Sequence, residues 1–356
     1  MLTIGAVFVV VVVGGMGSIP GAFIAALLVA ELKAVCIWLG VQEIAGLELS
    51  FSKLTLVVEF LVMAVVLIWR PWGLLGKPQA LARSAGEPEQ PLHPAGHGAA
   101  AAWLSLLTLL VLLPLMASSA EGGSYATVLL ADIFVAALFA SSLHFILGPG
   151  GMHSFGHAAY FGLGAYGAAL LVRTLDLPME AALLLGPLAA AAGALLYGWF
   201  CVRLSGVYLT MLTLAFAQIS WAIVFQWDDF TGGSNGLTGV WPPEWASQGP
   251  AFYWLALGIC ALGIYLLRSL LFSPLGYALR ASRDSALRAD AIGIDVRRIQ
   301  WTAFVIAGLF AGLAGALFAF SKGGVAPDAM SVTKSVDALV MVLLGGVQTL
   351  AGPVVG

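Results

Sequence analysis

The sequence predicts an all-α fold, a polytopic bundle of transmembrane helices with about nine or ten membrane segments. The first reason is composition, because 61% of the 356 residues are hydrophobic, only 9% are charged, and the mean hydropathy is +1.00. A soluble protein has about 25% charged residues, since most of its surface faces water. The second reason is that long apolar runs recur along the chain. Together these observations exclude a soluble globular protein.

The apolar runs have the length of membrane-spanning helices. About 20 apolar residues are needed to cross the hydrocarbon core, and a β-barrel would show short alternating segments instead. The runs cover approximately residues 4–30, 54–70, 99–118, 125–147, 155–173, 179–202, 206–227, 251–271, 301–320 and 337–356. Gly14-Gly15 lies in the first run and Gly345-Gly346 in the last, so each of these is either a simple span or a broken helix.

Basic residues predict the orientation, because Arg and Lys are retained on the cytoplasmic side of a membrane. Placing the polar segment 272–300 inside gives the following distribution. The inside set is Arg70, Lys77, Arg83, Arg203, Arg268, Arg280, Arg283, Arg288, Arg297 and Arg298, and the outside set is Lys33, Lys53, Arg173, Lys322 and Lys334. Residues 228–250, with Asp228, Asp229 and Glu244, then form an outer loop.

Several classes of function are excluded by charge and by missing motifs. The net charge of −3 argues against a nucleic-acid partner. Cys36, Cys201 and Cys260 lie far apart in apolar runs, so we expect neither a disulfide framework nor a metal site. The sequence has no GxxxxGK[ST] phosphate loop, no HExxH and no plausibly spaced Ser/His/Asp set. We therefore expect no enzyme activity and no cofactor in this chain.

One linker and one internal repeat predict two related membrane units. Residues 77–98 are polar and rich in Pro and Gly, which is typical of a flexible linker, and we expect a cytoplasmic tether between units 1–76 and 99–356. Val10–Ala25 aligns without gaps with Met341–Gly356, sharing apolar-Gly-Gly-x-x-[Ser/Thr]-[Ile/Leu]-x-Gly. Internal repeats are common in transporters. Because one copy lies near the start and the other at the last residue, we expect a fragment of a longer tandem protein.

The segment Ser273–Gln300 is polar, basic and flanked by apolar runs. Ser273-Pro274 predicts a helix start, and Gly293 predicts the end of that helix before a second one opens near Asp295. A short helix–Gly–helix element inside the cell can be gripped by a partner protein. The alternative is an ordinary loop that is basic because it stays on the cytoplasmic side.

This segment resembles the coupling loop of ABC importer permeases, in which alanines precede a glycine. The matching residues are Asp284, Ala286, Ala289, Ala291 and Gly293, with Asp where that element usually begins with Glu. Three further stretches resemble the branched-chain amino-acid (LIV-type) permeases: SFGHAAYFG from Ser154, TGGSNGL from Thr231 and AGLAGA from Ala311. Residues 99–356 resemble the M-type subunit without its last helices, and residues 1–77 resemble the C-terminal end of the paired H-type subunit.

The resemblance implies a multi-pass permease in the lipid bilayer of the bacterial inner membrane that imports branched-chain amino acids. It implies ABC ATPase subunits that bind ATP, a periplasmic solute-binding protein and another permease half or subunit as partners. The loop that would face the binding protein contains Thr231, Gly232, Gly233, Asn235 and Gly236, and an ordinary connecting loop is the alternative. Three rival functions remain: a permease for urea, short amides or a sugar, an ion-coupled secondary transporter, and a membrane scaffold that transports nothing.

Candidates for the translocation path come from two features. The half-helix ends at Gly14-Gly15 and Gly345-Gly346 could meet a zwitterionic solute with their backbone dipoles. The stretch Ser154, Phe155, Gly156 and His157 begins a helix rich in small residues, for which helix packing is favoured over lining the path. For His157, a hydrogen-bonded residue at a helix end is favoured over a proton relay.

Ionisable residues within apolar runs are functional candidates by default. Glu59 and Asp132 are of this kind, and either could act in transport or lie near the outer interface. Asp337 is expected at a helix start, where its charge would favour the N-terminal end of the helix dipole.

Overall fold

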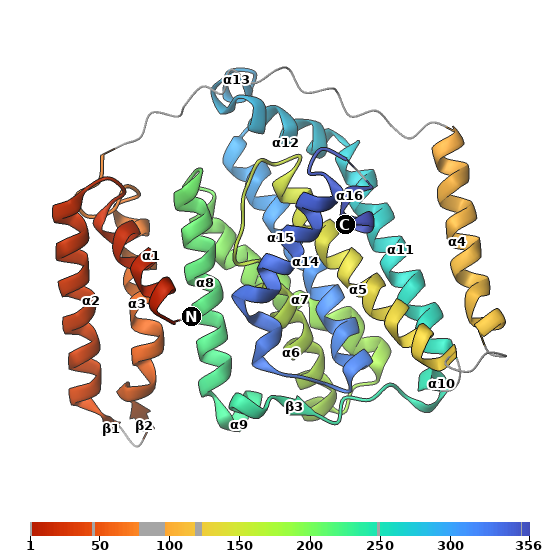
Figure 1. Ribbon diagram of the computed structural model, residues 1–356, viewed down its shortest axis with the longest axis horizontal. Coiled ribbons are helices and arrows are strands. Elements are labelled where there is room, and N and C mark those ends of the chain that lie inside the picture. The colour runs from red at the N-terminus through yellow and green to blue at the C-terminus, as the bar shows by residue number, and fades with distance from the viewer. Residues whose placement is uncertain (1, 45–46, 78–96, 118–122, 248–249, 350) are drawn as a thin grey trace.

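The computed structural model describes residues 2–44, 47–77, 97–117, 123–247, 250–349 and 351–356 (Figure 1). Within this part of the chain the fold is a polytopic helix bundle, which confirms the predicted all-α class. Among the described residues, seven helices are long and apolar enough to cross a membrane. They are α2 (Ile19–Leu39), α5 (Gly123–Leu147), α6 (His157–Leu175), α7 (Met179–Cys201), α8 (Val207–Gln226), α11 (Ala251–Leu271) and α14 (Val296–Lys322).

Shorter elements complete the bundle. The further helices are α1 (Leu2–Gly14), α3 (Phe51–Trp69), α4 (His97–Ala117), α9 (Asp228–Thr231), α10 (Glu244–Ser247), α12 (Pro274–Asp284), α13 (Ala286–Ala291), α15 (Val332–Gly345) and α16 (Gly352–Val355), with 3-10 turns η1 (Gly233–Asn235) and η2 (Pro327–Met330). Two small antiparallel sheets pair β1 (Val41–Ile44) with β2 (Leu47–Ser50) and β3 (Leu237–Thr238) with β4 (Gly324–Val325).

The centre of the bundle is formed by α6, α7 and α14, which approach closely through small residues. Gly164 of α6 lies against the backbone of Gly312 in α14, and Gly315 lies against the carbonyl of Phe161. Gly186 of α7 packs against Ala168 of α6. In lipid, helices gain little from burying apolar surface, so close van der Waals contact between backbones stabilises their association. The packing role that we favoured for the small residues of α6 is therefore confirmed.

Both copies of the sequence repeat contain the same helix break. Gly14 ends α1 and Gly345 ends α15, and the next residue has a positive φ in each copy, 99° at Gly15 and 97° at Gly346. In both copies the residue three positions further on donates its N–H across a 3.0 Å bond to the carbonyl of that glycine: Ser18 to Gly15 and Thr349 to Gly346.

The breaks are tight because glycine faces glycine. A Cβ on Gly14 would clash with the backbone of Gly21, and a Cβ on Gly345 would clash with the carbonyl of Gly352. These are the positions that the sequence alignment pairs, so the repeat is a repeat of structure. The broken-helix alternative is thus correct for the first and last apolar runs, and 4–30 is not one span.

The helices α1–α3 and the helix α4 flank the central helices on opposite sides (Figure 1). On one flank, α1–α3 pack against α8 mainly through α3, and the rings of Trp72 and Tyr208 meet edge to face at 6.1 Å. On the other flank, Tyr253 of α11 donates a 2.8 Å hydrogen bond to the carbonyl of Leu110 in α4. Linker residues 78–96 lie outside the described residues, and the division into H-type-like and M-type-like units stays a prediction.

We predict that Gly14→Ala and Gly345→Ala each destabilise the protein, because the new methyl group meets backbone atoms that cannot move without opening the break. Overpacking of this kind costs about 1–3 kcal/mol. The measurement is thermal unfolding of the purified protein in detergent. Gly258→Ala in α11 is the control, since a Cβ there meets nothing within 4 Å and Ala favours the helix. Equal melting temperatures for all three variants would contradict the interpretation.

Candidate functional site

The segment between α11 and α14 forms a short two-helix arm at one end of the bundle (Figure 1). Ser273 and Pro274 begin α12, as expected, but α12 ends at Asp284 and Ser285 caps a separate helix, α13. The single helix that we expected up to Gly293 is therefore wrong, because the Ser285 side chain accepts the N–H of Arg288 and starts a new turn. Gly293, with φ of 87°, ends the arm before Asp295 caps α14.

The predicted coupling residues lie together on this arm. Ala289 is buried against α14, and the other four are exposed: Asp284, Ala286, Ala291 and Gly293. Two large apolar side chains beside them also face outward, Leu287 with 85% of its surface exposed and Ile292 with 74%. Sequence reasoning did not single out either residue as a contact. Leu287 and Ile292 are thus large apolar side chains exposed on an otherwise polar, basic arm.

The arm is fixed to the bundle by Arg283. Its guanidinium donates a 2.9 Å hydrogen bond to the carbonyl of Gly148 in the loop after α5, and it forms an ion pair with Asp284 at 3.0 Å. Gly151 of the same loop lies against the aliphatic part of the Arg283 side chain, so closely that a Cβ at this position would clash with it. These contacts attach the arm to the loop at the end of α5.

The predicted outer loop is folded tightly at the opposite end of the bundle (Figure 1). Gly232, Gly233 and Gly236 all have positive φ and approach neighbouring atoms too closely for a side chain. Buried Thr231 donates its hydroxyl to the carbonyls of Val224 and Trp227. Of the five residues expected to face a binding protein, Asn235 alone is exposed.

The loop is also bound to the segment that leads into α15. β3 pairs with β4, and the N–H groups of Gly239 and Val240 both donate to the carbonyl of Gly323. The glycines therefore determine the shape of the loop, while Asn235 and its neighbours provide the surface.

The stretch from Ser154 to His157 lies at the buried start of α6. The His157 side chain is fully buried, and its Nε2 lies 2.8 Å from the hydroxyl of Ser142 in α5. Gly156 lies against the carbonyl of Thr213, and Phe155 donates its N–H to the Thr213 hydroxyl. The expectation of a hydrogen-bonded histidine at a helix end is confirmed.

Two carboxylates that sequence analysis marked as candidates are held in ion pairs. Glu59 of α3 lies 2.6 Å from the Nζ of Lys33 in α2, and Asp132 of α5 lies 2.6 Å from the Nζ of Lys322. The Glu59 side chain is only 5% exposed, whereas Asp132 is 31% exposed and also accepts from the Ser321 hydroxyl. Each pair joins two helices of the bundle.

α15 begins inside the bundle and not at its outer surface. α6 and α14 run parallel, and the ammonium of Lys334 lies 5.6 Å and 5.5 Å from the ring centres of Phe161 and Phe318. α14 continues past Phe318 to Lys322, which is about 6 Å further along its axis. The first turn of α15 therefore lies beside the outer half of α14, and α15 runs from there toward the end that carries the arm.

The helix start at Asp337 is a prediction that the structure corrects. Ser331 caps α15 by accepting the N–H of Lys334, and Asp337 lies in the second turn. The polar first turn hid this helix start from an argument based on apolar runs.

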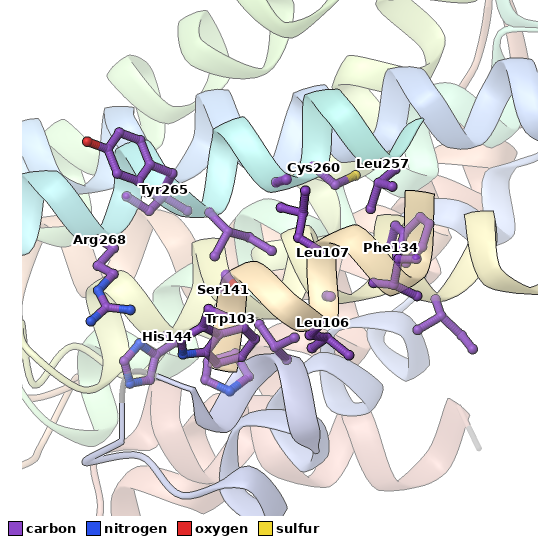
Figure 2. Close-up of a pocket in the computed structure, with 18 of the residues that line it drawn as sticks. Trp103, Leu106, Leu107, Phe134, Ser141, His144, Leu257, Cys260, Tyr265 and Arg268 are labelled. Atoms are coloured by element: carbon purple, nitrogen blue, oxygen red, sulfur yellow. The ribbon is translucent and has the colours of Figure 1, made fainter. Parts of the chain in front are cut away.

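A cavity lies elsewhere, between α4, α5 and α11 (Figure 2). It has a volume of about 410 Å³ and is lined mostly by Leu, Ile and Phe side chains. His144 and Arg268 lie together at one end of it, as Figure 2 shows. The Nε2 of His144 also lies 2.8 Å from the carbonyl of Val347, which follows the second helix break.

The fold and these features define a class: a polytopic membrane protein with repeated broken helices, a helix that starts within the bundle and an exposed two-helix arm. The sequence family described as branched-chain amino acid transport system / permease component matches residues 125–356. The chain belongs to this family. With seven helices in the described residues that are long and apolar enough to cross a membrane, it is a multi-pass membrane protein of that family.

The names of similar curated proteins agree with the family description. The chain is 30% identical over 270 residues to the high-affinity branched-chain amino acid transport system permease protein LivM of Escherichia coli, and equally to LivM of Salmonella typhimurium. Each alignment covers 68% of this chain and 62% of the relative, so the chain spans less than two thirds of their length. The permease BraD of Pseudomonas aeruginosa is 39% identical over 72 residues, 20% of either chain. No solved structure matches the chain.

We predict different costs for breaking the two ion pairs. Lys33→Met leaves the buried Glu59 carboxylate without its counter-ion, which costs about 3–5 kcal/mol. Lys322→Met breaks a more exposed pair and costs at most about 1 kcal/mol. Thermal unfolding in detergent measures both. Adding Glu59→Gln to Lys33→Met should recover part of the loss, and equal destabilisation by the two lysine variants would be the contrary result.

Proposed function

We propose that this chain is the membrane permease of an ATP-driven importer of branched-chain amino acids. The observation that carries the proposal is the family match over residues 125–356, which includes the broken helix at Gly345. The 30% identity to the two LivM proteins supports the same substrate class. The rival substrates (urea, short amides or a sugar) and the ion-coupled mechanism have no observation in their favour.

ABC ATPase subunits would bind at the α12–α13 arm. Leu287 and Ile292 offer apolar contacts, and Asp284, Ala286 and Gly293 beside them are exposed and small or short. A partner that covers this surface removes apolar area from water, which favours association. ATP would be bound by that partner, and this chain would hold no cofactor.

Arg283 connects the arm to the membrane-spanning helices. Because its guanidinium bonds to the carbonyl of Gly148, a push on α12 reaches the end of α5 directly. The His144 side chain of α5 contacts the carbonyl of Val347, just beyond the break that ends α15. ATP hydrolysis could thus change the position of α15 through a continuous set of contacts.

A periplasmic solute-binding protein would dock on the opposite end, at the outer loop. Asn235 is exposed there, and the neighbouring Asp229 and Glu244 are also exposed and acidic. We place the translocation path along α15 and its counterpart α1, the half-helices that end at Gly345 and Gly14. A second permease half or subunit would complete the path.

The test is uptake of labelled leucine into proteoliposomes that contain the full transporter with its ATPase and binding protein. We predict that Leu287→Asn lowers ATP-driven uptake at least about tenfold, because one well-placed interface residue contributes 2 kcal/mol or more to binding. The amount of the Leu287→Asn variant in the membrane should equal that of the wild type, since the Leu287 side chain is 85% exposed. Leu175→Asn, 63% exposed at the other end of the bundle, is the control. Uptake driven by an ion gradient without any ATPase would overturn the proposed function.

A further inference from the structure

Lys334 carries a charge that the rest of the described chain does not neutralise. Its ammonium lies over the rings of Phe161 and Phe318, at 5.6 Å and 5.5 Å from their centres. Within the described residues it makes no ion pair and no side-chain hydrogen bond. Lys33 and Lys322, by contrast, both have carboxylate partners at 2.6 Å. The two aromatic faces hold the ammonium in place by cation–π attraction and leave its N–H donors available.

The location of Lys334 makes an unneutralised charge costly. It is partly buried in the first turn of α15, beside the outer half of α14. A charged side chain at membrane depth is expensive and therefore marks a functional site unless it is paired. The start of α15 adds to the same field, because the N-terminal end of a helix carries a partial positive charge. An anionic group is the ligand that this position favours.

Asp337 supplies the opposite charge one turn further along. Residues three apart on a helix lie on the same face, so Lys334 and Asp337 point to the same side of α15. They do not form an ion pair with each other, and the described residues give Asp337 no other partner. The Asp337 side chain is exposed.

Apolar surface lies beside the two charges. Val340 of α15 is 44% exposed and lies one turn from Asp337 on the same face. The face therefore presents a cation, an anion and an aliphatic side chain in close succession. This is the complement of an α-amino acid with an aliphatic side chain.

We propose that Lys334 and the start of α15 bind the carboxylate of the transported amino acid, and that Asp337 binds its ammonium group. Val340 contacts the aliphatic side chain. This assignment rests on the proposed function for its substrate class. It places recognition of the zwitterion at the beginning of α15, about 20 Å from the glycine break that ends this helix.

Photolabelling of the full chain in proteoliposomes tests the site without requiring transport. The probe is photo-leucine, a diazirine analogue of leucine, and labelled peptides are mapped by mass spectrometry. We expect labelling within Val332–Gly345 that leucine suppresses, whereas isocaproate, which lacks the ammonium, and leucine amide, which lacks the carboxylate, do not. Labelling that maps to other helices, or suppression by both analogues as strong as by leucine, would overturn the assignment.

Uptake by the complete transporter then tests the two residues. We predict that Lys334→Met and Asp337→Asn each lower leucine uptake about tenfold to a hundredfold, because each loses a hydrogen bond to a charged group. Lys334→Arg keeps the charge and should retain most of the uptake.

The matched controls are Arg173→Gln and Asp176→Asn, an exposed basic and acidic residue with the same spacing at the end of α6. Control variants should transport like the wild type. If the wild-type transporter takes up leucine and the Lys334→Met and Asp337→Asn variants take it up equally well, the proposed binding site is wrong but the proposed function stands. Absence of leucine uptake by the wild-type transporter would instead refute the proposed function, and the photolabelling result would still decide whether the site binds amino acids.

Discussion

The rest of this structure depends on direct contact between the backbones of neighbouring helices, which glycine permits at the points where the helices meet. Gly164 against Gly312 and Gly315 against Phe161 bring α6 and α14 together along their length. Since lipid offers no hydrophobic driving force between helices, this closeness is what makes their association favourable. The parallel pairing of α6 and α14 then determines where the helix start of α15 can lie.

The same constraint operates at the two helix breaks, where it also satisfies backbone hydrogen bonds. An unpaired N–H or carbonyl in the bilayer is costly, so a broken helix needs local partners. Ser18 and Thr349 meet this need in the two copies by donating their N–H groups to the carbonyls of Gly15 and Gly346. Two segments more than 300 residues apart in the chain thus solve one problem in the same way.

Much of the fold followed from the sequence, because hydrophobic length and glycine pairs are local signals. Six of the seven long spans in the described residues coincide with predicted apolar runs, and the breaks after Gly14 and Gly345 were one of two alternatives that the glycine pairs indicated. The helix α2 instead begins inside the first predicted run and extends beyond it. The start of α15 was missed, because Ser331 caps a first turn that is polar, and apolar runs do not register such a turn. The separate helix α13 was missed for a similar reason, since a single serine cap divides a continuous helical pattern.

The candidate site was predictable in its parts but not in its geometry. The five coupling residues lie within ten positions of the sequence, from Asp284 to Gly293, so a local pattern was enough to locate them. The partners of Glu59 and Asp132 lie 26 and 190 residues away, and tertiary packing alone brings them within reach. The glycines of the outer loop resembled a docking surface in sequence, although their positive φ angles and close contacts give them a role in shaping the loop.

The two-stranded sheet of β3 and β4, with two residues in each strand, has a mechanical consequence. It joins the outer loop to β4, the strand that precedes η2 and α15. Hydrogen bonds from the N–H groups of Gly239 and Val240 to the carbonyl of Gly323 strengthen this connection. The ring of Trp241 lies against Gly323 on the same segment. Because these bonds join the loop to β4, a displacement of the loop also displaces the segment that leads into η2 and α15.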